Sequence, residues 1–165
     1  KTGGKAFVLF TSYKAMNETA ERLHDFFEHN RLLLMVQGQN LQRSQMLEAF
    51  RNDINSVIFG TDSFWMGVDV PGEALSNVII VKLPFPVPSH PLIAARKQQI
   101  EDKGGNSFRD YFLPEAILKF RQGVGRLIRG HDDSGIVVVL DPRIIRSSYG
   151  PAFLESIPDC DQHVF

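Results

Sequence analysis

The sequence predicts an α/β fold in which an open, mostly parallel sheet carries helices on both faces. Short runs rich in β-branched and aromatic residues alternate along the chain with longer amphipathic segments. These runs are almost continuously apolar, as expected for strands that are buried on both faces. The length of 165 residues suits a sizeable core, so we expect residues 1–165 to form one domain.

The first strand is expected at 6–12, where an apolar run ends in Thr11 and Ser12. Ser12 can cap the helix that we expect over 13–30, because apolar residues recur there at helical spacing. The next elements continue the alternation: a strand at 31–38, a helix at 41–53, and strands at 56–61 and 77–83.

The alternation stops at the proline-rich stretch 84–91, which can be neither a helix interior nor a central strand. A helix is expected at 92–103, and another begins at Pro114 and runs through 122–129. A last strand is expected at 135–141, and the mixed tail that follows is expected to pack on the surface.

Composition limits the class of protein. The formal net charge of −1 argues against a stand-alone nucleic-acid binder, although it allows a domain that supplies half of a groove. The single cysteine, Cys160, favours a reducing, cytoplasmic setting, and we interpret it as an incidental thiol. No apolar run approaches the roughly 20 residues of a membrane span, so no membrane partner is expected.

The stretch QGVGRLIR contains two arginines behind a glutamine. On a continuous helix, Gln122, Arg126 and Arg129 share one edge opposite the apolar face, so we expect them to point out of the domain. Gly123 and Gly125 cost helix stability, which suggests close approach by another backbone or a ligand. The alternative is an amphipathic helix with a solvated face, and the pattern alone leaves both interpretations open.

A second group of residues, FGTDSFWMGVDVPG, follows the third strand. Thr61 lies at the end of that strand, where a backbone N–H and a hydroxyl can hold a phosphate. Gly67 permits a positive φ, and the Asp69 carboxylate can accept hydrogen bonds or cap a turn. Phe64 and Trp65 could stack on a base, but core packing is the preferred interpretation.

Some motifs are absent from the sequence. It contains no G-x-x-x-x-G-K-[ST] phosphate loop and no G-x-G-x-x-G after the first strand, and its histidines lack metal-ligand spacing. A domain with an arginine edge but no phosphate cradle cannot hydrolyse a nucleotide by itself. It can complete a site whose cradle lies on another domain.

These motifs resemble those of superfamily 2 helicases. QGVGRLIR resembles motif VI, GTDSFWMGVDVPG resembles motif V, and VLFTSY resembles the motif that opens the second motor domain. The stretches LPFPVPSHPLIAAR, VVVLDPRII and YGPAFLESIP are similar to the DinG branch, which is related to XPD. The resemblance covers essentially the whole chain.

This resemblance implies a RecA-like three-layer fold and the second motor lobe of an ATP-dependent DNA helicase with a role in DNA repair. The first RecA-like lobe, with the phosphate loop and the carboxylates for Mg²⁺, would lie outside this chain and bind most of the ATP. The implied partner is single-stranded or forked DNA. An iron–sulfur cluster would, if present, also lie elsewhere in the complete protein.

The resemblance also implies roles for individual residues. Arg126 and Arg129 correspond to arginine fingers. The nucleotide side would be completed by Gln122, Gly67, Asp69 and Gly125, and the DNA side by Thr11, Ser12, Thr61, Asp62 and Ser63.

One residue departs from the family pattern, because Met66 stands where many relatives have glutamate. Two alternative functions remain open. One is a non-catalytic α/β module that binds a protein or a phosphorylated ligand through its arginine edge. The other is a self-sufficient nucleotide or flavin binder.

Overall fold

The computed structural model describes residues 3–53, 55–65, 75–127 and 134–165. The chain divides into two compact units, and each unit is made of two separate stretches of the sequence. The first comprises Lys1–Lys82 and Gln122–Asp141, and the second comprises Leu83–Arg121 and Pro142–Phe165.

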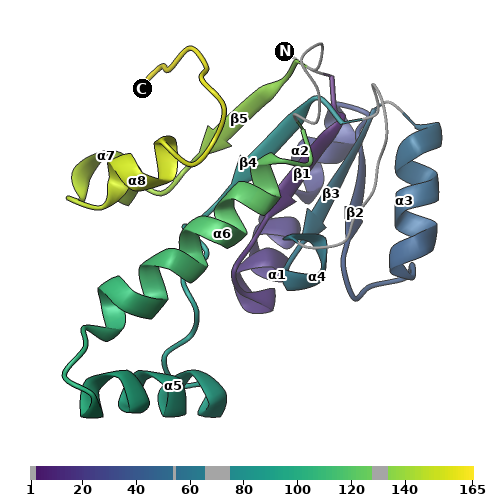
Figure 1. The fold of residues 1–165 in the computed structure, drawn as a ribbon. Coiled ribbons are helices and arrows are strands. Elements are labelled where there is room, and N and C mark those ends of the chain that lie inside the picture. Colours follow the sequence, from purple (N-terminus) through teal and green to yellow (C-terminus); the bar gives the residue numbers. More distant parts are fainter. Residues whose placement is uncertain (1–2, 54, 66–74, 128–133) are drawn as a thin grey trace. The chain divides into compact units, whose positions relative to one another are not determined.

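The first unit is built on a sheet whose strands follow the order β2-β3-β1-β4-β5 (Figure 1). Every pairing in it is parallel, which confirms the predicted open parallel sheet. Because all strands run the same way, their carboxyl ends meet at one edge, where ligands bind in sheets of this kind. The strands are β1 Ala6–Leu9, β2 Leu33–Val36, β3 Ser56–Gly60, β4 Asn77–Ile80 and β5 Ile136–Val139.

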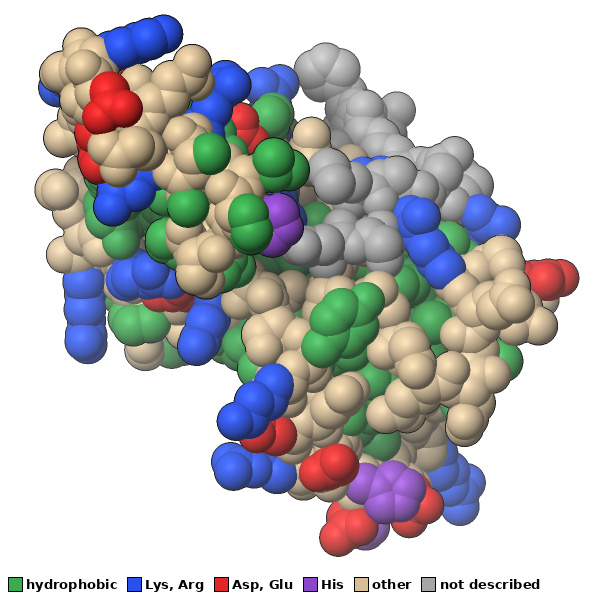
Figure 2. All heavy atoms as spheres, turned by 90° about the horizontal axis from the view of Figure 1, so that it is seen from below, with side chains coloured by type: hydrophobic (Ala, Val, Ile, Leu, Met, Phe, Trp, Pro, Cys, Tyr) green, Lys and Arg blue, Asp and Glu red, His purple; other side chains and the backbone are tan. Residues whose placement is uncertain are grey.

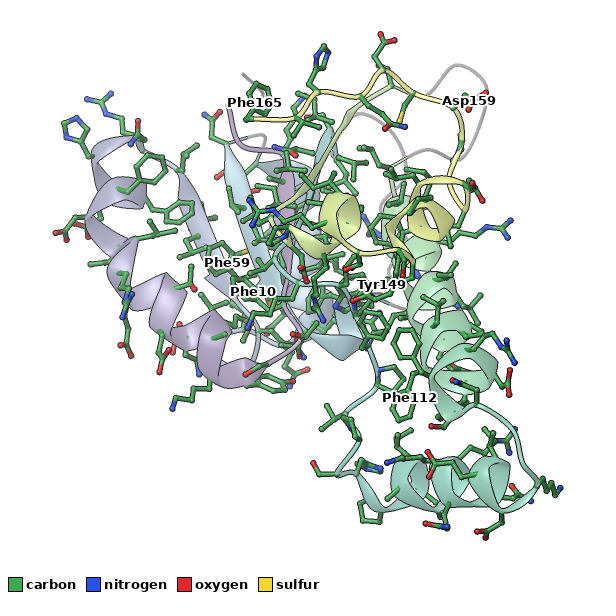
Figure 3. The ribbon with its side chains drawn as sticks, turned by 90° about the vertical axis from the view of Figure 1, so that its left-hand side faces the viewer. Phe10, Phe59, Phe112, Tyr149, Asp159 and Phe165 are labelled. Carbon is green, nitrogen blue, oxygen red and sulfur yellow. The ribbon has the colours of Figure 1, made fainter. Side chains whose placement is uncertain are left out.

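One face of the sheet is covered by α1 (Tyr13–Arg22) and α2 (His24–His29). Alternate residues of β1 point to this face, and they form a buried cluster with apolar side chains from both helices. Phe10, which follows β1, lies beside Phe59 of β3 with ring centroids 5.1 Å apart (Figure 3).

The opposite face carries α3 (Arg43–Asn52) and α4 (Asp62–Trp65). Phe7 of β1 points to this side, and its ring centroid is 4.9 Å from that of Phe50 on α3 and 6.3 Å from that of Phe64 on α4. Helices on both faces of a parallel sheet make three layers, as predicted.

Two predicted helices differ from the structure. The helix expected over 13–30 is two helices, because α1 ends at Arg22 and α2 begins at His24. The helix expected to run through 129 is α6 (Leu113–Val124), and it ends before either arginine of the motif is reached. Gly123 and Gly125 lie at this end, where the low helix propensity of glycine favours a stop.

The second unit is mainly helical. Its aromatic rings form one cluster: Phe85 contacts Phe108, Tyr149 and Phe153, and Phe120 contacts Phe153. The tail was expected on the surface, but this is wrong for Phe153, which is 0% exposed. The helical elements are α5 Pro91–Asp102, a π-helix at Phe108–Phe112, most of α6, α7 Arg143–Arg146 and α8 Gly150–Leu154.

The surface carries charges of both signs. On the face shown in Figure 2, basic and acidic side chains are interspersed, in keeping with the formal net charge of −1. Across the described ranges, no helix combines the length and the apolar character that a membrane crossing requires.

Candidate functional site at the carboxyl edge of the sheet

Arg126 lies in the turn that follows α6, and its side chain is half-buried. The guanidinium Nη2 donates a hydrogen bond to the carbonyl oxygen of Trp65, at 3.3 Å. Trp65 ends α4, the short helix that follows β3, and its indole Nε1 donates to the carbonyl oxygen of Phe10 at 3.1 Å. Two hydrogen bonds therefore tie Arg126 to the ends of two neighbouring strands, β1 and β3.

The continuous helix that would place Gln122 and Arg126 on one outward edge does not form. The prediction assumed one continuous helix, but the backbone turns at 125–127. Arg126 is consequently half-buried against Trp65, and Gln122, in the last turn of α6, is also half-buried. Arg129 lies outside the described residues.

Gly123 is packed against the protein's own aromatic core. A Cβ atom at this position would lie 2.9 Å from two ring carbons of Trp65 and 3.2 Å from Cδ1 of Leu9. The sequence suggested close approach by a ligand or another backbone, but a tryptophan side chain makes the approach. Phe64 and Trp65 are both fully buried, so core packing is confirmed and Trp65 presents no surface to a base.

Thr61 follows β3 and is only 3% exposed. Its backbone N–H and its hydroxyl Oγ1 both donate to Oε1 of Gln37, at 2.6 Å and 3.1 Å. The Nε2 amide of Gln37 in turn donates to the hydroxyl oxygen of Tyr13 at 2.6 Å. Both donors that were assigned to a phosphate thus have an acceptor within the protein.

Gln37 and Tyr13 were missed from the sequence. The signal for them was available, because Gln37 directly follows β2 and Tyr13 follows Ser12 near the end of β1. The rule that ligands bind beyond the carboxyl ends of parallel strands applies to these positions as much as to Thr61.

The remaining predicted residues fall into two groups. Ser12 is exposed, and its Oγ accepts a hydrogen bond from the backbone N–H of Ala15 at 3.3 Å, which confirms the predicted cap. Thr11 is half-buried. Asp62 and Ser63 lie in α4, but their side chains are outside the described part, as are Met66, Gly67 and Asp69 entirely.

The described side chains at this edge favour an anion over a metal ion. Arginine offers five N–H donors and no acceptor, so Arg126 fits phosphate oxygens and cannot ligate Mg²⁺. Among the described residues, the histidine and carboxylates that could share a cation are His24, Asp25 and Glu28, which are exposed on α2. The Nε2 atom of His24 lies 3.3 Å from Oε1 of Glu28. This group is on α2 and is separate from the Trp65 carbonyl that holds Arg126.

A comparison with protein-family models finds a match to the helicase C-terminal domain over residues 1–160. The ATP-dependent DNA helicase YoaA of Haemophilus influenzae is 45% identical over 156 residues. The ATP-dependent DNA helicase DinG of Photobacterium profundum is 45% identical over 157 residues, and the 3'-5' exonuclease DinG of Bacillus subtilis is 39% identical over 155. The alignments cover 93–94% of this chain but only 17–24% of these relatives.

Solved structures share the fold. The structure named XPD_APO superposes with a TM-score of 0.70 at 23% identity, covering 92% of this chain and 31% of the other. A second, named XPD_Helicase, gives 0.68 at 23% identity and covers 92% of this chain and 27% of the other. These likenesses confirm the RecA-like α/β fold.

Proposed function

Because the chain belongs to the helicase C-terminal domain family, we propose that it is the second motor lobe of an ATP-dependent DNA helicase. In this proposal the complete protein couples ATP hydrolysis to translocation on single-stranded DNA and to duplex unwinding. The partner is a first RecA-like lobe that carries the phosphate loop. The observation that carries the proposal is the family match over 1–160, together with Arg126 held at the carboxyl edge of a parallel sheet.

Arg126 is the residue that we assign to the transferring phosphate. Its bond to the Trp65 carbonyl fixes the guanidinium beyond β3, and the planar fork of a guanidinium matches the geometry of phosphate oxygens. An arginine supplied to the transferring group by a second domain can accelerate phosphoryl transfer by about 10³–10⁵. Placing it on this lobe makes hydrolysis depend on closure of the two lobes around ATP.

The other nucleotide contacts follow from the places of these residues in the two motifs. We propose Arg129 as a second finger, and Gln122 and Gly125, which flank the end of α6, as neighbours of the same phosphate group. Gly67 and Asp69 complete this side by their place in the motif. We assign the Mg²⁺ ion to the first lobe, together with the phosphate loop.

The DNA side follows the ends of β1 and β3. We propose that Thr11, Ser12, Thr61, Asp62 and Ser63 contact the phosphates of a single strand, so that binding is tolerant of sequence and sensitive to salt. For Thr61 the structure adds a condition. Its two donors are engaged by Gln37, so a phosphate can use them only when Gln37 Oε1 moves away.

The finger assignment is tested in the complete polypeptide that carries both lobes. Arg126→Ala and Arg129→Ala should each lower ATP turnover at least about 10³-fold, while the dissociation constant for ATP changes only a few-fold. The matched control is Arg121→Ala, which removes an exposed arginine five residues before Arg126. Normal turnover in both finger variants, or equal loss in the control, would contradict the assignment.

The two-lobe arrangement is tested with the 165-residue chain itself. It should show no Mg²⁺-dependent ATP hydrolysis, because the phosphate loop lies on the other lobe. Measurable hydrolysis by the purified chain would refute the proposal. If the complete polypeptide also fails to hydrolyse ATP but binds a phosphorylated ligand through Arg126, the non-catalytic binding module is the better description.

A further inference from the structure

Tyr13 is an exposed aromatic residue that is held at both ends of its side chain. It is the first residue of α1, whose start is fixed by the Ser12 cap. Its hydroxyl accepts the hydrogen bond from Gln37 Nε2, and its Cε1 lies 3.8 Å from the position that a Cβ on Gly38 would occupy. Gly38 has a φ of +83°, a conformation that glycine adopts at little cost. The residue is nevertheless 52% exposed.

The ring stands at the edge where the DNA contacts are proposed. Tyr13 is two residues after Thr11, and its hydroxyl is linked through Gln37 to Thr61. These residues follow β1, β2 and β3, which are consecutive in the sheet. The hydrogen-bonded chain Tyr13–Gln37–Thr61 therefore spans the ends of three strands. Its most exposed member is the aromatic residue Tyr13.

The hydroxyl of Tyr13 serves the hydrogen bond from Gln37, while about half of the residue stays exposed to solvent. Burying the ring would stabilise the fold more than exposing it, and its hydroxyl could be solvated without Gln37. A ring that is already ordered loses little conformational entropy when a flat ligand stacks on it. The polar neighbours Ser12 and Gln37 favour a planar ligand that carries hydrogen-bonding groups along its edge, as a nucleobase does.

We propose that the ring of Tyr13 is a stacking surface for one base of the bound single strand. This inference rests on the proposed function and adds to it a contact with a base, whereas the other DNA contacts are with phosphates. Stacking on an aromatic ring tolerates any base, because every base has a π-face. The contact is consistent with sequence-independent translocation.

The test compares two strands and four proteins, all as the complete polypeptide. The strands are a fluorescent oligothymidylate and an abasic strand of equal length, which has the same phosphates and no bases. The proteins are wild type, Tyr13→Ala, Tyr13→Phe and the control Phe26→Ala, which truncates an aromatic of similar exposure (54%) on α2. Fluorescence anisotropy gives each dissociation constant, and circular dichroism verifies that each variant is folded.

The decisive quantity is the ratio of affinities for the two strands. Tyr13→Ala should lower this ratio about 5- to 150-fold, which corresponds to the loss of one base stack. Its affinity for the abasic strand should change less than about twofold, because the phosphate contacts remain. Tyr13→Phe keeps the ring and should retain most of the ratio, and Phe26→Ala should retain all of it.

Each outcome decides between the alternatives. If Tyr13→Phe loses as much as Tyr13→Ala, the hydroxyl and not the ring makes the contact, and the stacking proposal is wrong. If Tyr13→Ala keeps the wild-type ratio, the inference fails while the proposed function stands. If the wild type binds neither strand, the proposed function fails first. A Tyr13 surface that serves a protein partner would give the second of these results.

Discussion

The contact between Gly123 and Trp65 yields a quantitative prediction for Gly123→Ala. The added Cβ would meet two carbons of the Trp65 ring at 2.9 Å, where ordinary contacts begin at 3.4 Å. The ring would have to retreat by about 0.5 Å, the difference between these distances. Trp65 is 0% exposed, and its Nε1 is anchored to the Phe10 carbonyl, so it has little room to move.

Two effects oppose each other in this variant. Overpacking a well-filled core costs about 1–3 kcal/mol. Replacing glycine by alanine in a helix interior gains up to about 1 kcal/mol, and less at position 123, which is next to the last residue of α6. The steric cost is larger, so we expect Gly123→Ala to lower the free energy of unfolding by about 1–2 kcal/mol.

Urea denaturation measures this change, and the slope of the transition should stay constant. Trp65 is the single tryptophan of the chain, so its emission reports directly on the perturbed ring. A double-mutant cycle with Trp65→Phe isolates the contact: the smaller ring should relieve most of the cost of Gly123→Ala, as followed by circular dichroism. Equal or greater stability of Gly123→Ala, or strict additivity in the cycle, would refute the reasoning.

Two further stability predictions concern the strand ends. Thr61→Val should lower the free energy of unfolding by only about 0.5–1.5 kcal/mol. The reason is that Gln37 Oε1 keeps its 2.6 Å hydrogen bond from the backbone N–H of residue 61, so no buried acceptor loses its last donor. A loss above about 3 kcal/mol in urea denaturation would mean that the hydroxyl stabilises more than its bond to Gln37. Ser12→Ala should lower the free energy of unfolding by about 1 kcal/mol, because it removes the side-chain acceptor for the Ala15 N–H. Ser12→Asn keeps an acceptor and should retain most of this stability. If both variants unfold at the same urea concentration, the cap contributes nothing to stability.

The sheet could be predicted because its signal is local and repeated. Each strand is a short apolar run, and parallel strands buried on both faces require such runs. The helix ends were less predictable. The helical wheel for 122–129 continued the helical period through two glycines, yet α6 ends at Val124. The contact between Gly123 and the indole of Trp65, which is distant in sequence, could be found only in the packed structure.

The candidate site was predicted in part, for a similar reason. Thr61 was identified from its place after a strand, but its partner Gln37 is 24 residues away, and no short motif joins them. Tyr13 was passed over because an aromatic at the start of a helix predicts nothing by itself. The register of three strands brings these residues together, and register follows from the whole sheet.

Trp65 occupies the centre of this arrangement, and its role explains why two proposed functions can meet in one small lobe. Its indole holds the backbone after β1, which leads into Thr11, and its carbonyl holds the guanidinium of Arg126. A displacement of the Arg126 turn towards a nucleotide therefore cannot leave the end of β1 unaffected unless one of these two hydrogen bonds breaks. The residue assigned to the phosphate and the strand end assigned to DNA are thus joined through one buried residue, by its backbone carbonyl on one side and its indole on the other. Energetic coupling between sites can be carried by packed side chains and hydrogen-bond networks, and the buried Trp65, which lies close against Gly123, is such an element.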